Sequence, residues 1–189
     1  MANFVAVLDA CVLYPASVRD LLLRLALTDL FRARWTDRIH DEWIRAVLEQ
    51  RKDLTQAQLQ RTRELMNKAV PDCLVHSYES LIDDLQLPDA DDRHVLAAAL
   101  HCQAGVIVTY NLKHFPEEAL ARHEIRAQHP DEFISHLFEL DAGAACAAVR
   151  DQRKSLKHPP LSVDELLNEF LARELAETVA RLKAMQQLL

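Results

Sequence analysis

Glycine is almost absent from this chain, which contains only Gly105 and Gly143. A loop that holds phosphate groups with its backbone N–H groups needs several closely spaced glycines, so the sequence excludes the glycine-rich nucleotide-binding motifs. Glycine is also unfavourable inside helices. Its scarcity therefore fits a fold that is rich in helices.

Paired cysteines and long apolar runs are missing as well. The four cysteines are scattered through the chain without a C-x-x-C pair: Cys11, Cys73, Cys102 and Cys146. This pattern favours free thiols in a reducing compartment over a zinc site or a disulfide framework. No stretch is long and apolar enough to span a membrane, and the first residues lack the basic start and apolar run of a signal peptide. We therefore expect a cytoplasmic protein with no membrane partner.

An excess of positive charge is the third absence. The 189 residues carry a formal net charge of −7, which argues against a simple basic clamp for nucleic acid. A nuclease is not excluded, because acids that hold a cation add to the negative charge and the cation restores the balance. The length is sufficient for one sizeable core with a small appendage.

What the chain does have is an alternation of short apolar runs and amphipathic segments. The runs predict strands at residues 4–8, 74–75, 106–109 and 125–127, and the amphipathic segments predict helices at 15–27, 38–51, 55–69, 78–85, 95–100 and 116–123 and from 130 onward. Strands that alternate with helices in this way indicate an α/β fold, with a parallel sheet covered on both faces by helices.

The composition changes near residue 140. An alanine-rich stretch, a basic segment at 150–157 and a break at 158–160 are followed by a capping box made by Ser162 and Glu165 and by an amphipathic helix toward residue 189. We therefore divide the chain into a first domain, 1–140, and a C-terminal helical extension, 141–189. Packing on the core is the expected role of the extension, and dimerisation and partner binding are the alternatives.

Acidic residues are concentrated where this fold would bring them together. In residues 87–100, LPDADDRHVLAAAL, three aspartates precede an apolar helix: Asp89, Asp91 and Asp92. One or two acids there would serve as helix-start signals, whereas three neighbouring acids favour the binding of a cation. Asp9 ends the first predicted strand, at the edge where open α/β sheets bind ligands.

Two further oxygen-bearing side chains come from other segments. Asn111 directly follows the strand at 106–109, and Glu42 lies near the edge of the apolar stripe of the helix at 38–51. Oxygen ligands without a matching histidine or cysteine set suit a hard cation such as Mg²⁺ or Mn²⁺. Each residue also has a plain structural alternative, namely a turn residue for Asp9 and Asn111, a helix cap for the aspartates and a surface acid for Glu42.

Four segments, in this order, resemble the motifs of the PIN-domain nucleases, and within that family the VapC-type toxins of bacterial toxin–antitoxin pairs: VLDACVLYP, HDEWIRAV, LPDADDRHVLAAAL and IVTYNLKHFP. The resemblance covers roughly residues 4–140 and implies a PIN-like (Rossmann-like) parallel sheet flanked by helices. It also implies RNA cleavage with Mg²⁺ or Mn²⁺ held by acids. The segment from 141 onward resembles the C-terminal helical extension of a larger subgroup of these toxins.

The resemblance assigns roles to individual residues. It implies that Asp9, Glu42 and Asp92 are the catalytic acids that hold the metal. Substrate or auxiliary roles are implied for Asp89 as an additional acid, for Thr109 at the strand end and for Asn111 at the fourth acidic position. Asp91 is left as a helix-capping or solvated residue. Two departures stand out, because Cys11 replaces a small polar residue and His114 replaces a frequent aspartate.

The function implied is an endoribonuclease, the toxin of a type II toxin–antitoxin pair, in which a metal-activated water attacks the phosphate. Its implied partners are an RNA substrate, a protein antitoxin that places a basic side chain in the acidic groove, and a second copy of the chain. The alternative is a catalytically silent PIN-fold module that binds RNA or acts as a scaffold. A phosphatase of the haloacid dehalogenase type is disfavoured because Cys11 stands where a second aspartate is needed. For a receiver domain the acids come in the wrong order.

Overall fold

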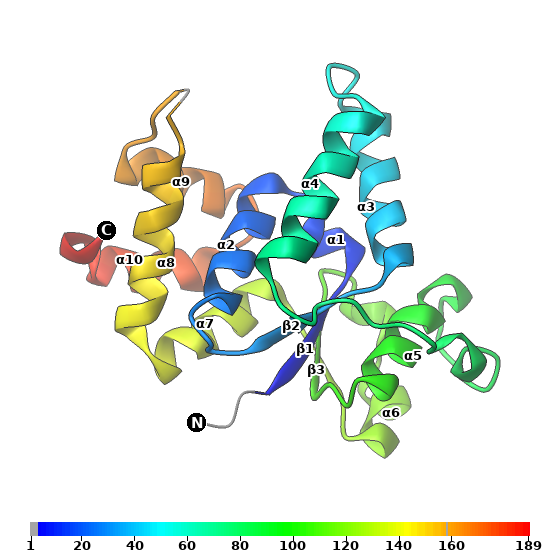
Figure 1. Ribbon diagram of the computed structural model, residues 1–189. Helices are drawn as coiled ribbons and strands as arrows, with labels where there is room; N and C mark the ends of the chain where they lie inside the picture. Colours follow the sequence, from blue (N-terminus) through cyan, green and yellow to red (C-terminus); the bar gives the residue numbers. More distant parts are fainter. Residues whose placement is uncertain (1–3, 158) are drawn as a thin grey trace.

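A parallel sheet lies at the centre of the computed structural model, which describes residues 4–157 and 159–189 (Figure 1). The sheet has the strand order β2-β1-β3-β4, and every neighbouring pair is parallel. The strands are short: β1 (Val5–Leu8), β2 (Arg32–Arg34), β3 (Val106–Val108) and β4 (Arg126–Gln128). The predicted α/β class, a parallel sheet flanked by helices, is confirmed.

One predicted strand was wrong. The second strand is Arg32–Arg34, whereas Leu74 forms only an isolated bridge with Trp35. The sequence Arg-Ala-Arg gives no apolar run, because β2 lies at the edge of the sheet and buries only its central residue, Ala33. A strand with one buried position carries too little hydrophobic pattern to be recognised.

The helices before residue 141 largely follow the sequence pattern. They are α1 (Ala10–Leu13), α2 (Ala16–Ala26), α3 (Asp37–Gln50), α4 (Gln56–Ala69), α5 (Arg93–His101), α6 (Glu117–Leu120) and α7 (Pro130–Leu140). The side chains of Thr36 and Thr55 cap α3 and α4. The helix expected over 78–85 is only a 3₁₀ turn at Glu79–Leu81, and α1 was not anticipated. The short α1 begins directly after Asp9 and so positions that residue.

The C-terminal extension consists of α8 (Ala142–Ser155), α9 (Val163–Leu171) and α10 (Ala176–Ala184). The predicted capping box of Ser162 and Glu165 begins α9, whereas the single amphipathic helix expected beyond it is split into two. His158, part of the expected break, lies outside the described residues. Helix α8 packs on α2 and α7, and α10 packs on α7, so the extension packs on the core as expected.

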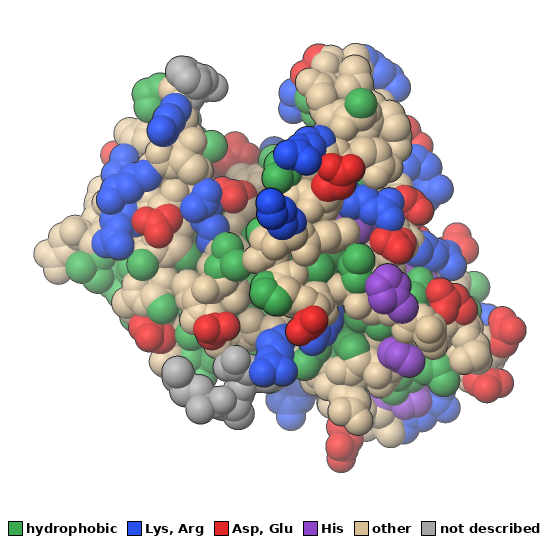
Figure 2. Space-filling model, in the orientation of Figure 1, with side chains coloured by type: hydrophobic (Ala, Val, Ile, Leu, Met, Phe, Trp, Pro, Cys, Tyr) green, Lys and Arg blue, Asp and Glu red, His purple; other side chains and the backbone are tan. Residues whose placement is uncertain are grey.

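Two arms rise from the body of the molecule, one formed by α8 and α9 and the other by α3 and α4. The surface is hollowed between them, and Lys and Arg side chains gather over α8 (Figure 2). All four cysteines are free thiols, as predicted. Within the described residues, none of the helices combines the length and the apolar character that crossing a membrane requires.

Candidate functional site

Asp9 is the most firmly held of the acids at the carboxyl edge of the sheet. It follows β1, and its backbone N–H donates to the carbonyl of Val108 in β3 (3.1 Å). One carboxylate oxygen accepts from the N–H of Ala10 (2.6 Å), and the other accepts from the Thr109 hydroxyl (2.7 Å) and the Cys11 thiol (3.1 Å). Only 3% of Asp9 is exposed. The end of β1 and the start of α1 therefore fix the carboxylate in one orientation.

Cys11 and Thr109 both donate hydrogen bonds to the carboxylate of Asp9. Burial, and then the charge of Asp9, raise the pKa of the Cys11 thiol, so the thiol stays protonated and can donate to the carboxylate. The sulfur also accepts from the N–H of Tyr110 (3.2 Å), and the Thr109 hydroxyl accepts from the N–H of Asn111 (3.0 Å). Cys11 thus links Asp9 to the backbone of Tyr110, and Thr109 orders the end of β3.

Glu42 approaches the same edge from α3. Its Oε1 lies 3.2 Å from Arg38 Nε and 3.0 Å from Nε2 of His94 in α5. His94 is 1% exposed, and within residues 4–157 and 159–189 neither of its ring nitrogens has a partner with hydrogen-bond geometry, so this contact is close but poorly aligned. Burial opposes ionisation of Glu42, but His94 and Arg38 outweigh it and lower the pKa of its carboxyl. These two neighbours therefore favour the ionised form of Glu42.

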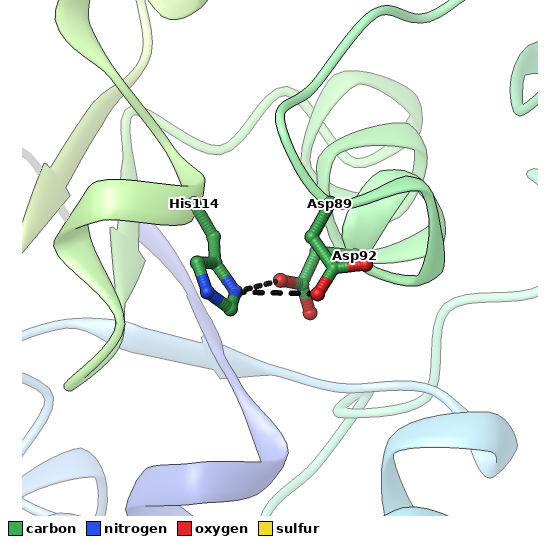
Figure 3. A group of neighbouring side chains, drawn as sticks. All are labelled: Asp89, Asp92 and His114. Carbon is green, nitrogen blue, oxygen red and sulfur yellow. Dashed lines mark hydrogen bonds and ion pairs between the residues drawn. The ribbon is translucent and has the colours of Figure 1, made fainter.

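Asp89 and Asp92 meet His114 on the other side of the site (Figure 3). Nδ1 of His114 lies 2.6 Å from Asp92 Oδ2 and 3.7 Å from Asp89 Oδ2. One donor atom from each of the three residues lies within 4.8 Å of the others, a spacing that a metal ion can bridge. Burial raises the pKa of the Asp92 carboxyl, the hydrogen bond from His114 opposes this rise, and the charges of Asp9 and Asp89 add to it.

An open cleft of about 500 Å³ joins these segments. Four of the residues predicted for the site line it: Asp9, Glu42, Asp92 and Asn111. The other two do not line it, since Thr109 is buried beneath Asp9 and Asp89 faces His114. The set Asp9, Glu42 and Asp92 is not among the groups whose donor atoms all lie within 4.8 Å.

Asp91 has a different position from the one expected for a helix cap. The Asp89 side chain caps this turn by accepting from the N–H of Asp91 (3.0 Å), while Asp91 itself is exposed at the cleft. The capping interpretation of Asp91 was therefore wrong, and the solvated alternative agrees with its exposure. Asp91 adds one more negative charge beside Asp92.

Sequence reasoning missed the two histidine contacts and the aromatic lining. His94 follows Asp92 by two residues in the apolar helix, and this spacing is the signal that could have pointed to its contact with Glu42. Arg19 is half-buried next to this lining: its Nη1 donates to the carbonyl of Leu13 (2.6 Å), and its guanidinium lies 4.6 Å from the centroid of the Trp43 ring. No pattern in the sequence indicates that Tyr14 and Trp43 line the cleft.

Comparison with known proteins gives matches to two family models and to a relative. A family model described as "PIN domain" matches residues 5–113, and one described as "VapC50 C-terminal domain" matches residues 130–184. A protein of Mycobacterium tuberculosis (strain ATCC 25618 / H37Rv), named "Putative ribonuclease VapC50", is 44% identical over 77 residues. That alignment covers 41% of this chain and 46% of the relative, so the chain matches about half of the relative's length. No solved structure matches the chain.

Proposed function

This chain belongs to the PIN-domain family, and from that premise we propose that it is a metal-dependent endoribonuclease in which an activated water cleaves RNA phosphodiester bonds. The observation that carries the proposal is the cleft at the carboxyl edge of the sheet, where Asp9, Glu42 and Asp92 come from three separate segments. Crowded acids destabilise a protein unless they serve a cation. The boundary between a nuclease domain, 1–140, and the extension, 141–189, remains part of the proposal.

The donor set fits Mg²⁺ or Mn²⁺. Both ions prefer oxygen ligands, and the cleft offers carboxylates from Asp9, Glu42 and Asp92. Burial and the charges of Asp9 and Asp89 raise the pKa of the Asp92 carboxyl, and a cation would offset the cost of ionising it. When bound, such an ion lowers the pKa of a water molecule and offsets the negative charge of the phosphate.

The residues of the chain have separate tasks in this proposal. Thr109 and Cys11 orient Asp9, and His94 and Arg38 orient Glu42. Glu42 is the better candidate for orienting the attacking water, because its pKa is low and it lines the cleft, whereas Asp89 does not. Attack by water on phosphorus with departure of the 3′ oxygen leaves 5′-phosphate and 3′-hydroxyl ends.

We propose further that the protein is the toxin of a type II toxin–antitoxin pair, and that it acts in the cytoplasm. Support comes from the relative named as a ribonuclease, VapC50, and from the match of residues 130–184 to the C-terminal domain model of the same name. The four free thiols fit a reducing compartment. A protein antitoxin would place a basic side chain against the acids of the cleft, and a second copy of the chain remains an expected partner.

One observation favours the alternative, a catalytically silent PIN-fold module that binds RNA or acts as a scaffold. Nδ1 of His114 lies 2.6 Å from Oδ2 of Asp92, so a bound metal would have to share this oxygen with the histidine, use it as a further ligand or displace it. If this contact keeps the metal out, the chain has the PIN fold but does not cleave RNA. Metal-dependent cleavage therefore separates the two functions.

The test is cleavage of cellular RNA by the purified protein, with the new ends mapped. With Mg²⁺ or Mn²⁺ we expect defined cuts that disappear with a chelator and in Asp9→Ala and Asp92→Asn. Asp151→Asn, at an exposed aspartate of α8, is the matched control and should cleave normally. Growth arrest on expression should vanish with the same two substitutions. If the wild-type protein fails to cleave RNA with either metal, as Asp92→Asn does, the chain is the silent module, whereas equal cleavage by both proteins would contradict the site assignment.

A further inference from the structure

A second, smaller cavity adjoins the cleft. Its volume is about 210 Å³, and it is lined by Tyr14, Pro15 and Tyr110 and by residues 172–174 of the C-terminal extension. Cys11 and Tyr14 line both the cleft and this cavity, so the two spaces share a wall. Residues 172–174, in the loop between α9 and α10, thus line the same cavity as Cys11, which contacts Asp9.

The loop is held firmly in this place. The Tyr110 hydroxyl donates to the carbonyl of Arg173 (2.9 Å), although the two residues are 63 positions apart. The Tyr110 ring meets His129 edge to face, with centroids 5.0 Å apart, and His129 lies 3.8 Å from Glu174. On either side of the loop, Phe170 and Leu175 are completely buried. The cavity is therefore a preformed part of the fold.

The lining suits an unpaired nucleobase. Tyrosine rings are the surfaces on which proteins stack single-stranded bases, and arginine adds a cation for stacking or for a phosphate. Arg173 is partly exposed and is held near the cavity by Glu169 (3.3 Å). Sites that enclose a whole drug-sized ligand measure about 300–1,000 Å³. A cavity of about 210 Å³ is the right scale for one base.

We propose that this cavity binds the base of a nucleotide next to the scissile phosphate, with Tyr14 and Tyr110 as stacking surfaces and Arg173 as the phosphate contact. The inference rests on the proposed ribonuclease function and deepens it, because it makes the C-terminal extension a wall of the substrate site. The cavity would then select one base by its shape and by stacking. The acids of the cleft would act on the phosphate and would need no contact with a base.

The first experiment tests whether Tyr14 contacts one particular base of the RNA. A short RNA around the mapped cleavage site is prepared with each flanking nucleotide in turn made abasic, and is cut by the wild-type protein, Tyr14→Ala and Tyr14→Phe. Tyr14→Ala should lower kcat/KM about 5- to 150-fold, the usual effect of losing one base–aromatic stack. One abasic position should cause the same loss in the wild-type protein and no further loss in Tyr14→Ala. Tyr14→Phe keeps the ring, so it should lose less kcat/KM than Tyr14→Ala and should still be impaired further by that abasic position.

The second experiment measures binding without cleavage, in the Asp92→Asn background. Arg173→Ala should weaken RNA binding and lower the slope of affinity against salt concentration by about one. Arg61→Ala is the matched control, since Arg61 is an exposed arginine of α4 that pairs with Glu64 and lies far along the chain from the cavity. Thermal unfolding of each variant shows whether a loss of binding follows from a loss of structure.

Three outcomes would overturn the inference. If Tyr14→Ala is impaired equally on intact and on every abasic RNA, the cavity does not hold a base, while the proposed function stands as long as Asp92→Asn is inactive. If both Tyr14→Ala and Arg173→Ala cleave normally but lose binding to the protein antitoxin, the cavity serves that partner. If the wild-type protein cleaves no RNA with either metal, the proposed function fails and this inference fails with it.

Discussion

At the scale of single residues, three acids of one cleft have different neighbours and therefore different properties. Asp9 accepts only from neutral donors, namely Ala10, Thr109 and Cys11. Glu42 lies against Arg38 and His94, which favour its ionised form. For Asp92, burial and like charges outweigh the contact with His114 and disfavour ionisation. The ionised form of Asp92 thus costs the protein stability, and a cation would offset that cost.

The first residue-scale prediction concerns Asp92 and stability. Since its folded-state pKa is raised, the ionised carboxylate opposes folding at neutral pH, and that cost disappears as the pH falls through the raised pKa. Asp92→Asn removes the charge and keeps an oxygen for His114, so it should melt at a higher temperature without metal. Each kcal/mol corresponds to about 2–4 °C for a chain of this length.

The measurement is thermal unfolding of the wild-type protein and Asp92→Asn at neutral pH, with a chelator and then with Mn²⁺. Mn²⁺ should stabilise the wild-type protein and leave Asp92→Asn unchanged, because a ligand stabilises only the fold that binds it. Asp151→Asn should respond like the wild-type protein. A lower melting temperature of Asp92→Asn in the chelator would show that the charge of Asp92 stabilises the fold.

The second residue-scale prediction concerns His94 as a positioning residue for Glu42. The contact of 3.0 Å links a buried histidine to an acid of the cleft. Loss of such an outer partner typically lowers metal affinity or activity about 10- to 100-fold. We expect this loss in His94→Ala and partial recovery in His94→Gln, whose amide keeps a polar group beside Glu42.

The readouts for His94 are the Mn²⁺ affinity of the folded protein and the separate values of kcat and KM. His101→Ala, at the exposed end of the same helix, is the control and should bind Mn²⁺ normally. If His94 only fills space, His94→Gln and His94→Ala will both lose stability and keep the same Mn²⁺ affinity as the wild-type protein.

At the scale of elements, the sequence predicts what local pattern encodes. Strands β1 and β3 are apolar runs, and α3 and α4 begin at threonine caps, so all four were found. Strand β2 buries only Ala33 and was missed. The site divides in the same way. Asp9 and Asp92 stand at a strand end and a helix start, whereas the contacts of Glu42 with His94 and of Tyr110 with Arg173 join distant segments, which no local pattern encodes.

The element-scale prediction concerns Asp131, which caps a helix other than its own. It belongs to α7 and accepts from the N–H groups of Glu177 and Thr178 at the start of α10, both at 2.8 Å. Asp131 is 8% exposed, and the helix N-terminus favours its negative charge. Asp131→Ala should therefore lower the free energy of unfolding by about 2–4 kcal/mol.

Urea denaturation measures this effect, and Asp141 supplies the comparison. Asp141 caps its own helix, α8, by accepting from the N–H of Ala144 (2.9 Å) at an exposed position. Asp141→Ala should cost about 1 kcal/mol, the usual value of an N-cap. Equal effects of the two substitutions would mean that Asp131 contributes nothing beyond an ordinary cap.

At the scale of the whole molecule, the extension is built into the fold. Helix α8 packs on α2 and α7, α10 packs on α7, and the buried residues of the extension include Phe170, Leu175 and Leu182. Gln152 in α8 also donates to the carbonyl of Ser17 in α2 (2.9 Å). Removal of the extension would expose the apolar faces of α2 and α7. The two parts of the chain should therefore depend on each other for stability.

The whole-molecule prediction is a single cooperative unfolding transition. Trp35 and Trp43 are fully buried and both lie before residue 141, so tryptophan fluorescence reports on the first part alone. Far-ultraviolet circular dichroism reports on all helices, including α8, α9 and α10. Coincident transitions by the two probes are the mark of one folding unit, and a fragment of residues 1–140 should aggregate or stay unfolded. A circular dichroism transition that precedes the fluorescence transition would show instead that the extension unfolds by itself. In that case the loop at 172–174 would separate from Tyr110 while the acidic cleft stayed folded.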